Sequence, residues 1–202
     1  IQETFSVFIH APFKEHLSSA EKDKNSTSIV FQARFKENAG DTKFSGLAMF
    51  GGDSDHYSWD IILNKTKKYG NDKKEQALDW DIFLAPHHCS WSFFNDRPQN
   101  ENPEPKETSL QVLDYKRVGG KIIASSKKII NDDVNPPHYE AKQEYIKKLT
   151  ASGDFLNTSV EPKESKPEPI VFEITASGVK RVVEDATSSE KLDAAVAVAA
   201  SG

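Results

Sequence analysis

The sequence predicts an α/β protein in which helices pack on a mixed β-sheet. Short apolar runs of strand length come first along the chain, apolar runs then alternate with stretches of helical periodicity, and turn residues such as glycine and proline separate many of them. With 202 residues, the chain is long enough for one domain of ordinary size. This order predicts antiparallel strands first and strand–helix alternation afterwards, an α+β sandwich with flanking helices.

Three strands are predicted in the N-terminal part of the chain. Residues 5–10 are mostly apolar, and residues 13–27 form a polar loop behind them. Residues 28–36 and 43–50 are two further runs of strand type, and the turn residues at 38–41 join them as a hairpin.

A helix is predicted directly after the third strand. Ser54 or Asp55 is the expected N-cap, and Trp59, Ile62 and Leu63 supply the apolar side. The remaining elements follow from the same rules. They are a strand at 80–85, a helix at 107–118 that uses Leu110, Leu113 and Val118 and stops at Gly119-Gly120, a strand at 121–125, a helix at 138–150, a linker at 161–169, a terminal hairpin within 170–185 and an Ala-rich tail at 186–202.

Composition limits the possible partners. The net charge of −5 argues against a basic domain with a broad nucleic-acid footprint, although bound metal ions can supply positive charge for a phosphodiester substrate. No apolar run approaches the about 18 residues of a membrane span, so no such span is expected. The single cysteine, Cys89, rules out a disulfide within the chain and predicts a cytoplasmic location.

Gly51-Gly52-Asp53 is the first candidate for chemistry. Glycines behind an apolar strand allow the backbone to approach a ligand closely, and a carboxylate placed there could bridge two metal ions. The alternative is a Gly-Gly turn in which the aspartate caps the next helix.

Two adjacent histidines, His87 and His88, follow the strand at 80–85. Ligands of open α/β sheets gather at the carboxyl ends of strands, and imidazole is a common zinc ligand. Because neighbouring side chains point in different directions, we expect one histidine to bind metal and the other to orient substrate or ligand. The alternative is a pair of hydrogen-bonded loop histidines.

Three further residues complete the set of candidates. His10 ends a strand, where a lone histidine is usually structural. His138 lies directly before a predicted helix, so its alternative is a surface residue at a helix start. Cys89 beside His88 would need a base oriented by a third group to act as a nucleophile, and a small, partly buried side chain is the expected role.

In order and spacing, these segments resemble the C-terminal half of the metallo-β-lactamase domain found in the competence protein ComEC and its soluble relatives. The first two matches are Asn25-Ser26-Thr27-Ser28-Ile29-Val30, like the family's Asn-x-x-Ser-hydrophobic strand, and Ala48-Met49-Phe50-Gly51-Gly52-Asp53, like its strand ending in Gly-Asp. The third is Trp80 to Ser90, like its strand leading into His-His-Gly-Ser. The fourth is Ile122-Ile123-Ala124-Ser125-Ser126 with Asn135-Pro136-Pro137-His138, like its Ser-ending strand and Asn-x-x-His segment.

The resemblance covers about residues 5–150 and implies that residues 1–160 are half of an αββα metallo-β-lactamase fold. It implies that Asp53 bridges two metal ions and that one of His87 and His88 is the last metal ligand. His138 would lie near the substrate. Asp53, His88 and His138 are the predicted catalytic residues, and the predicted metal ligands are Asp53, His87, His88 and His10.

The chain departs from the family in two places. Cys89 stands where the family usually has glycine, and the signature His-x-His-x-Asp-His is absent from the 202 residues. Since the signature supplies most of the ligands, this chain alone should bind metal weakly or not at all. Three explanations stay open: a longer hydrolase of which this is the C-terminal piece, a second chain that carries the first half, or a degenerate relative. The first is preferred, because half of a sandwich leaves apolar sheet surface exposed.

The resemblance implies a metal-dependent hydrolase, a phosphodiesterase rather than a β-lactamase, that uses two zinc or manganese ions once the upstream ligands are present. The rival hypothesis is a non-catalytic interaction module derived from the same fold.

Overall fold

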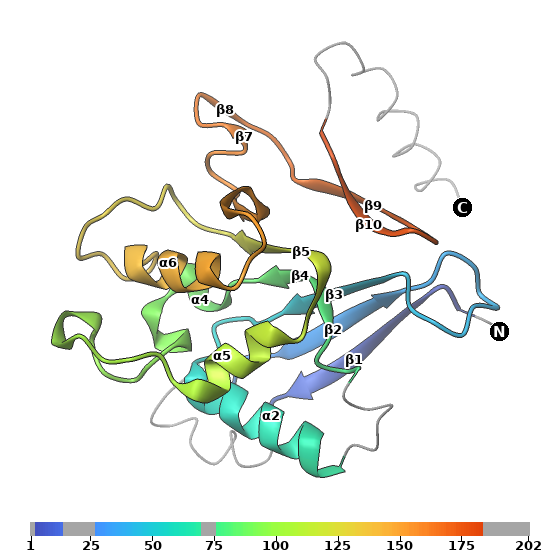
Figure 1. The fold of residues 1–202 in the computed structure, drawn as a ribbon, viewed down its shortest axis with the longest axis horizontal. Helices are drawn as coiled ribbons and strands as arrows, with labels where there is room; N and C mark the ends of the chain where they lie inside the picture. The colour runs from blue at the N-terminus through green and yellow to red at the C-terminus, as the bar shows by residue number, and fades with distance from the viewer. Residues whose placement is uncertain (1–2, 14–26, 70–75, 184–202) are drawn as a thin grey trace.

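The computed structural model describes residues 3–13, 27–69 and 76–183 (Figure 1). In that part of the chain six strands form one mixed sheet in the order β1-β2-β3-β4-β5-β6. The first three strands pair antiparallel, and β3 to β6 pair parallel, which confirms the predicted mixed α/β class. The strands are β1 Phe5–Ala11, β2 Val30–Phe35, β3 Gly46–Phe50, β4 Trp80–Leu84, β5 Lys116–Ala124 and β6 Phe155–Asn157.

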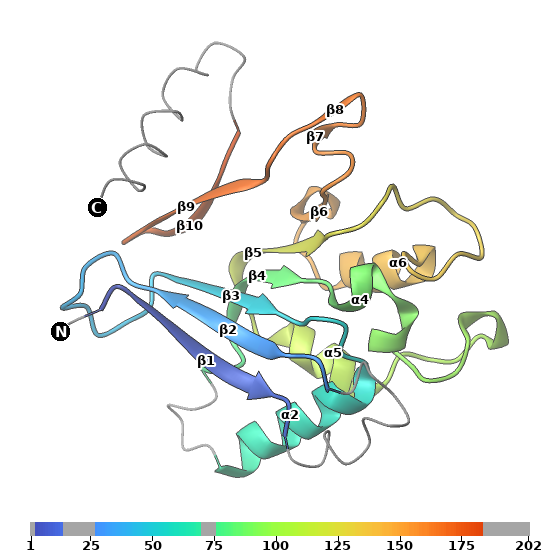
Figure 2. The same cartoon turned by 180° about the vertical axis from the view of Figure 1, so that it is seen from behind.

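The connections between the parallel strands contain helices that share one face of the sheet. Strand–helix–strand crossovers are almost always right-handed, so strands added in one direction place their helices on the same side. Figures 1 and 2 show α2, α5 and α6 together on that side. The helices are α2 His56–Tyr69, α4 Pro86–Cys89, α5 Glu107–Asp114 and α6 Tyr139–Lys147, with the 3-10 turns η2 Trp91–Phe93, η3 Gln99–Glu101 and η4 Ser152–Asp154.

The core lies between the sheet and these helices. Trp59, Ile62 and Leu63, the predicted apolar side of α2, are at most 1% exposed. Phe83 of β4 packs against Trp59 and also contacts Tyr145 of α6. Residues spaced three and four apart on a helix share one face, which explains why the sequence pattern predicted these buried side chains.

Part of the other face of the sheet is covered by a hairpin, β9 Val171–Thr175 with β10 Gly178–Val182. The sequence predicted this hairpin but not its place on the sheet. A Cβ added to Gly46 of β3 would lie 2.9 Å from Val179 Cγ2, so the hairpin packs directly on this strand. The second apolar cluster lies beneath the hairpin and comprises Ala33, Ala48, Ile82, Ile123 and Leu156, with Phe31, Phe35, Phe50, Leu84, Ile170, Phe172 and Val179 at its rim.

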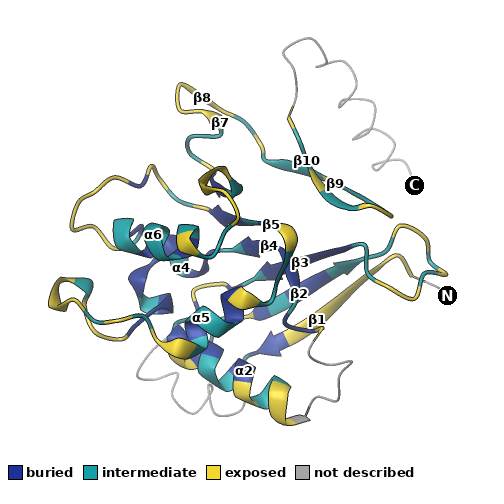
Figure 3. Cartoon of the chain, in the orientation of Figure 1, coloured by how far each residue is buried: buried dark blue, intermediate teal, exposed yellow. Residues whose placement is uncertain are grey.

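The β9–β10 hairpin does not cover strand β1. On its outer face Phe5 is 49%, Val7 44% and Ile9 59% exposed (Figure 3). These residues pair with Phe35, Ala33 and Phe31 of β2, which carry the apolar surface onward to the second cluster.

The helix predicted at 107–118 and the strand predicted at 121–125 need correction. The helix predicted at 107–118 ends at Asp114, and β5 begins at Lys116. Val118 therefore lies in a strand and is fully exposed instead of packing in the core. Gly119, at φ +79°, belongs to a strand with an irregular register and does not end a helix. Lys116 pairs with Trp80 of β4 and so brings this segment into the sheet. Such pairing with a distant strand can override a local helical pattern.

The sequence pattern also missed β6 and the small ladder between β7, Pro162–Lys163, and β8, Lys166–Pro167, which occupies the predicted linker. Most of the loop predicted at 13–27 and all of the tail predicted at 186–202 lie outside the described residues. None of the helices in the described part of the chain combines the length and apolar character that crossing a bilayer requires.

Candidate functional site

The predicted site segments meet at one edge of the sheet. The parallel strands β3, β4, β5 and β6 all end at this edge, and the antiparallel β2 begins there. Three loops therefore gather, after β3, after β4 and after β5. This edge is where ligands of open α/β sheets usually bind.

The Gly51-Gly52-Asp53 turn is pressed against the histidine turn. A Cβ on Gly51 would lie 2.5 Å from Pro86 Cγ, so only glycine fits there. Gly52 adopts φ +55°, and its carbonyl oxygen accepts a hydrogen bond from the backbone N–H of His87 at 2.8 Å. The two glycines thus serve close contact between two site loops.

Asp53 is exposed, and its backbone N–H donates to Ser28 Oγ at 3.1 Å. The alternative role as helix cap is wrong for Asp53, because Asp55 Oδ1 accepts the backbone N–H of Ser58 at 3.0 Å and so caps α2. The Asp53 carboxylate therefore lies on the surface of this edge, where it is open to a ligand.

The residues after β4 form a left-handed turn. His87, His88 and Cys89 have φ angles of 47°, 58° and 70°. A left-handed conformation costs an L-residue with a side chain roughly 1–2 kcal/mol, and such strain clusters at functional sites. Three consecutive residues in this region show that the surrounding contacts impose the turn.

The two imidazoles of this turn differ in environment, as predicted for adjacent residues. Their ring centroids lie 6.3 Å apart. The His88 ring is exposed, and its Nδ1 lies 2.7 Å from the carbonyl oxygen of Ser125. Since a carbonyl oxygen only accepts, Nδ1 carries the proton and Nε2 of the neutral ring keeps its lone pair. His87 is half-buried, and its Nδ1 has no hydrogen-bond partner within the described residues.

His138 reaches the same place from the loop after β5. It precedes α6 as the N-cap residue, is 8% exposed, and its backbone N–H donates to Cys89 O at 2.9 Å. Burial lowers the pKa of its imidazole, while Glu140, Asp132 and Asp133 oppose this shift. The alternative of a surface residue is wrong, since His138 is buried beside Trp91 with ring centroids 5.8 Å apart.

His10 lies at the same edge but in a different environment. It is 3% exposed, and its Nε2 lies 2.8 Å from Ala77 O, in the segment that precedes β4. Burial lowers its pKa from 6.5 to about 4. These contacts support the structural role that a lone histidine at a strand end usually has, and they set His10 apart from the three site loops.

Cys89 and His56 are two further buried residues near this edge. Burial raises the pKa of the Cys89 thiol to about 12, which argues against a nucleophilic thiolate. His56 received no role from the sequence, yet it is 5% exposed and lies 3.6 Å from Asp96. Its spacing to Trp59 and Leu63 places it on the buried face of α2, which is the signal that sequence reasoning missed.

The donors at this edge suit a metal ion in kind but not in number. Imidazole nitrogen and carboxylate oxygen are both common zinc ligands. Within the described residues, however, no three His, Cys, Asp or Glu side chains gather closely enough to hold an ion.

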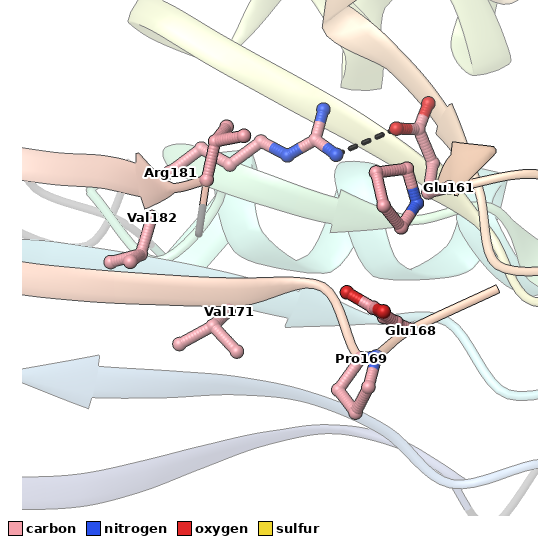
Figure 4. A pocket seen from close by; sticks show the side chains of 8 residues that line it. Glu161, Glu168, Pro169, Val171, Arg181 and Val182 are labelled. Atoms are coloured by element: carbon pink, nitrogen blue, oxygen red, sulfur yellow. Dashed lines mark hydrogen bonds and ion pairs between the residues drawn. The ribbon is translucent and has the colours of Figure 1, made fainter. Parts of the chain in front are cut away.

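A pocket of about 170 Å³ lies elsewhere, between the β9–β10 hairpin and the segment before it (Figure 4). Arg181 forms an ion pair of 2.6 Å with Glu161 there, so the charge of its guanidinium group is already neutralised. The pocket is lined by Glu161, Pro162, Glu168, Pro169, Val171, Arg181, Val182 and Val183, none of which is a candidate site residue.

No protein-family model, curated protein or solved structure matches this chain.

Proposed function

We propose that this chain supplies the late part of the active site of a metal-dependent hydrolase of the metallo-β-lactamase superfamily that cleaves phosphodiesters. The hydrogen bond from His88 Nδ1 to Ser125 O carries this proposal. A histidine that ligates metal almost always donates its other ring N–H to a carbonyl or carboxylate oxygen, which fixes the tautomer and orients the ring. His88 is arranged in this way, and its side chain is exposed.

Asp53 and His88 would be the metal ligands of this chain. Their turns are joined by the hydrogen bond between Gly52 O and His87 N, so the exposed carboxylate and the exposed imidazole belong to neighbouring loops. Two zinc or manganese ions, when bound, would lower the pKa of a bound water and polarise a phosphoryl oxygen of the substrate. The role of the chain is to fix the positions of these two ligands.

The charge around the edge favours such cations. Asp132 and Asp133 are exposed and act electrostatically on His138, and Asp53 adds a third exposed carboxylate. These carboxylates alone repel a phosphodiester, whereas bound cations invert the local potential. His138, buried beside Trp91 at the same edge, would then lie near the substrate.

The remaining ligands would come from a first half of the domain, on the same polypeptide or on a second chain. The apolar outer face of β1 supports this part of the proposal. Phe5, Val7 and Ile9 are between 44% and 59% exposed, and contiguous exposed apolar surface usually marks an interface. A second sheet layer packed on this face would bury it.

Metal analysis of the full-length native protein, isolated without chelators together with any partner that copurifies, tests the proposal. Wild type should hold near-stoichiometric zinc or manganese and hydrolyse bis(p-nitrophenyl) phosphate. Asp53→Asn and His88→Gln should each lower metal affinity by more than about tenfold. Asp114→Asn, which alters an exposed ion pair with Lys148, is the matched control and should change neither quantity. Isolation of the wild-type protein without bound metal would overturn the proposal of a metal-dependent hydrolase.

The second candidate is a non-catalytic interaction module, favoured by the same exposed face of β1. In that case Ile9→Thr should weaken partner binding while Asp53→Asn leaves it unchanged. Loss of hydrolysis in Asp53→Asn would exclude a purely non-catalytic role.

A further inference from the structure

The left-handed turn at His87–Cys89 requires contacts from outside its own segment to persist. The turn segment closes with a backbone hydrogen bond from Ser90 N–H to Pro86 O at 3.3 Å. Isolated left-handed turns of residues with side chains are unfavourable, so the stabilising contacts must be tertiary.

Asn135 provides two of these contacts from the loop after β5. Its Oδ1 accepts a hydrogen bond from Ser90 Oγ at 2.9 Å and a second from the backbone N–H of Trp91 at 3.1 Å. A backbone N–H can only donate, so the amide of Asn135 must present its oxygen here. The residues it holds are the first two after the turn.

The loop after β5 also contacts the turn at two further points. His138 N–H donates to Cys89 O at 2.9 Å, and His88 Nδ1 binds Ser125 O at 2.7 Å. Ser125 begins the loop, while Asn135 and His138 end it, so the loop holds the turn on both sides. Release of the contact at Asn135 would let the strained turn relax and would draw His88 away from Ser125.

We propose that Asn135 is a positioning residue, which holds the turn in its left-handed conformation and thereby keeps His88 in the Nδ1–H tautomer with Nε2 free. The role of Asn135 in holding the turn follows from the contacts above. The importance of that role for catalysis rests on the proposed function. Asn135 acts through Ser90 and Trp91 and is assigned no contact with metal or substrate.

The test uses the full-length native protein and three variants. Asn135→Ala removes the acceptor, Asn135→Asp keeps an oxygen acceptor for both hydrogen bonds, and Asn131→Ala changes an exposed asparagine of the same loop. Long-range proton–nitrogen NMR of the metal-stripped protein reports the His88 tautomer, and backbone carbon shifts report φ at His87 and His88. Asn135→Ala should give mixed tautomers and lose the left-handed shifts, whereas the other two should match wild type.

Zinc affinity is the second readout, and Asn135→Ala should lower it by about 10- to 100-fold, the usual effect of removing a supporting residue. An unchanged His88 tautomer in Asn135→Ala would overturn the inference. If Asn135→Ala does not fold, Ser90→Ala replaces it, since this variant removes one of the two hydrogen bonds, and an unchanged tautomer there overturns the inference equally. Altered NMR signals in a protein that binds no zinc would sink the proposed function and leave the positioning role intact.

Discussion

The two faces of the sheet are closed to different extents. On the helix-covered face, Met49, Phe83 and Ile122 from three neighbouring strands are all 0% exposed. On the opposite face, Ala48, Ile82 and Ile123 of the same strands are 6–8% exposed beneath the hairpin. The contrast grows along the sheet, because Phe5, Val7 and Ile9 of β1 are largely uncovered (Figure 3).

This difference shows which part of the molecule stabilises the fold and which part is open to a partner. Helices with interlocking aromatic side chains close one face, whereas a two-stranded hairpin, marginal by itself, covers only part of the other. Most of the folding free energy should therefore come from the helix side. The uncovered part of β1 is the surface that has most to gain from binding another apolar surface.

The largest effect is expected from Phe83→Ala. Phe83 contacts Trp59, Trp80, Phe93 and Tyr145 with ring centroids 5.3 to 6.4 Å apart, so truncation should cost about 3–5 kcal/mol of unfolding free energy.

The midpoint of urea unfolding measures this cost, and Phe50→Ala is the matched change on the opposite face. Phe50 is only half-buried, stacked on Phe31, and its truncation should cost about half as much. Equal costs would show that the two faces contribute alike.

A pH effect of intermediate size is expected from His10, in the buried end of β1. Its folded pKa of about 4 lies below the unfolded value of 6.5, so protonation favours the unfolded state. The contribution is fully present above pH 6.5 and is lost as the pH falls toward about 4. The difference corresponds to about 3 kcal/mol at most.

Urea midpoints measured across this pH window check the prediction. His10→Gln should flatten part of the slope, and the remainder belongs to other buried histidines such as His56, whose pKa is also lowered by burial. A slope in His10→Gln identical to that of wild type would mean that solvent reaches His10 in the folded protein.

The smallest effect is expected from Ile9→Thr on the uncovered side of β1. Ile9 is 59% exposed, and threonine retains the β-branched shape. The unfolding free energy from urea titration should therefore change by less than about 0.5 kcal/mol. A loss as large as that of Phe83→Ala in the isolated chain would contradict the open face.

The sequence by itself determined the local elements. Short apolar runs bounded by turn residues predicted the first five strands, although the length of β5 was underestimated. The spacing of Trp59, Ile62 and Leu63 predicted the buried side of α2. Local periodicity succeeds there because each run carries its own pattern of burial. It failed at Lys116–Val118, where strand pairing overrides a helical pattern, and at the three residues of β6, whose pattern is too short to detect.

Only the tertiary structure decided how the candidate site is built. The sequence located Asp53, His87, His88 and His138. It did not indicate that His88 binds Ser125, that His87 binds Gly52, or that Asn135 holds the His87–Cys89 turn. These contacts join residues 35 to 45 positions apart, and parallel pairing of β3, β4 and β5 brings them together. The left-handed turn was invisible for the same reason, since its strain is offset by partners that local sequence does not contain.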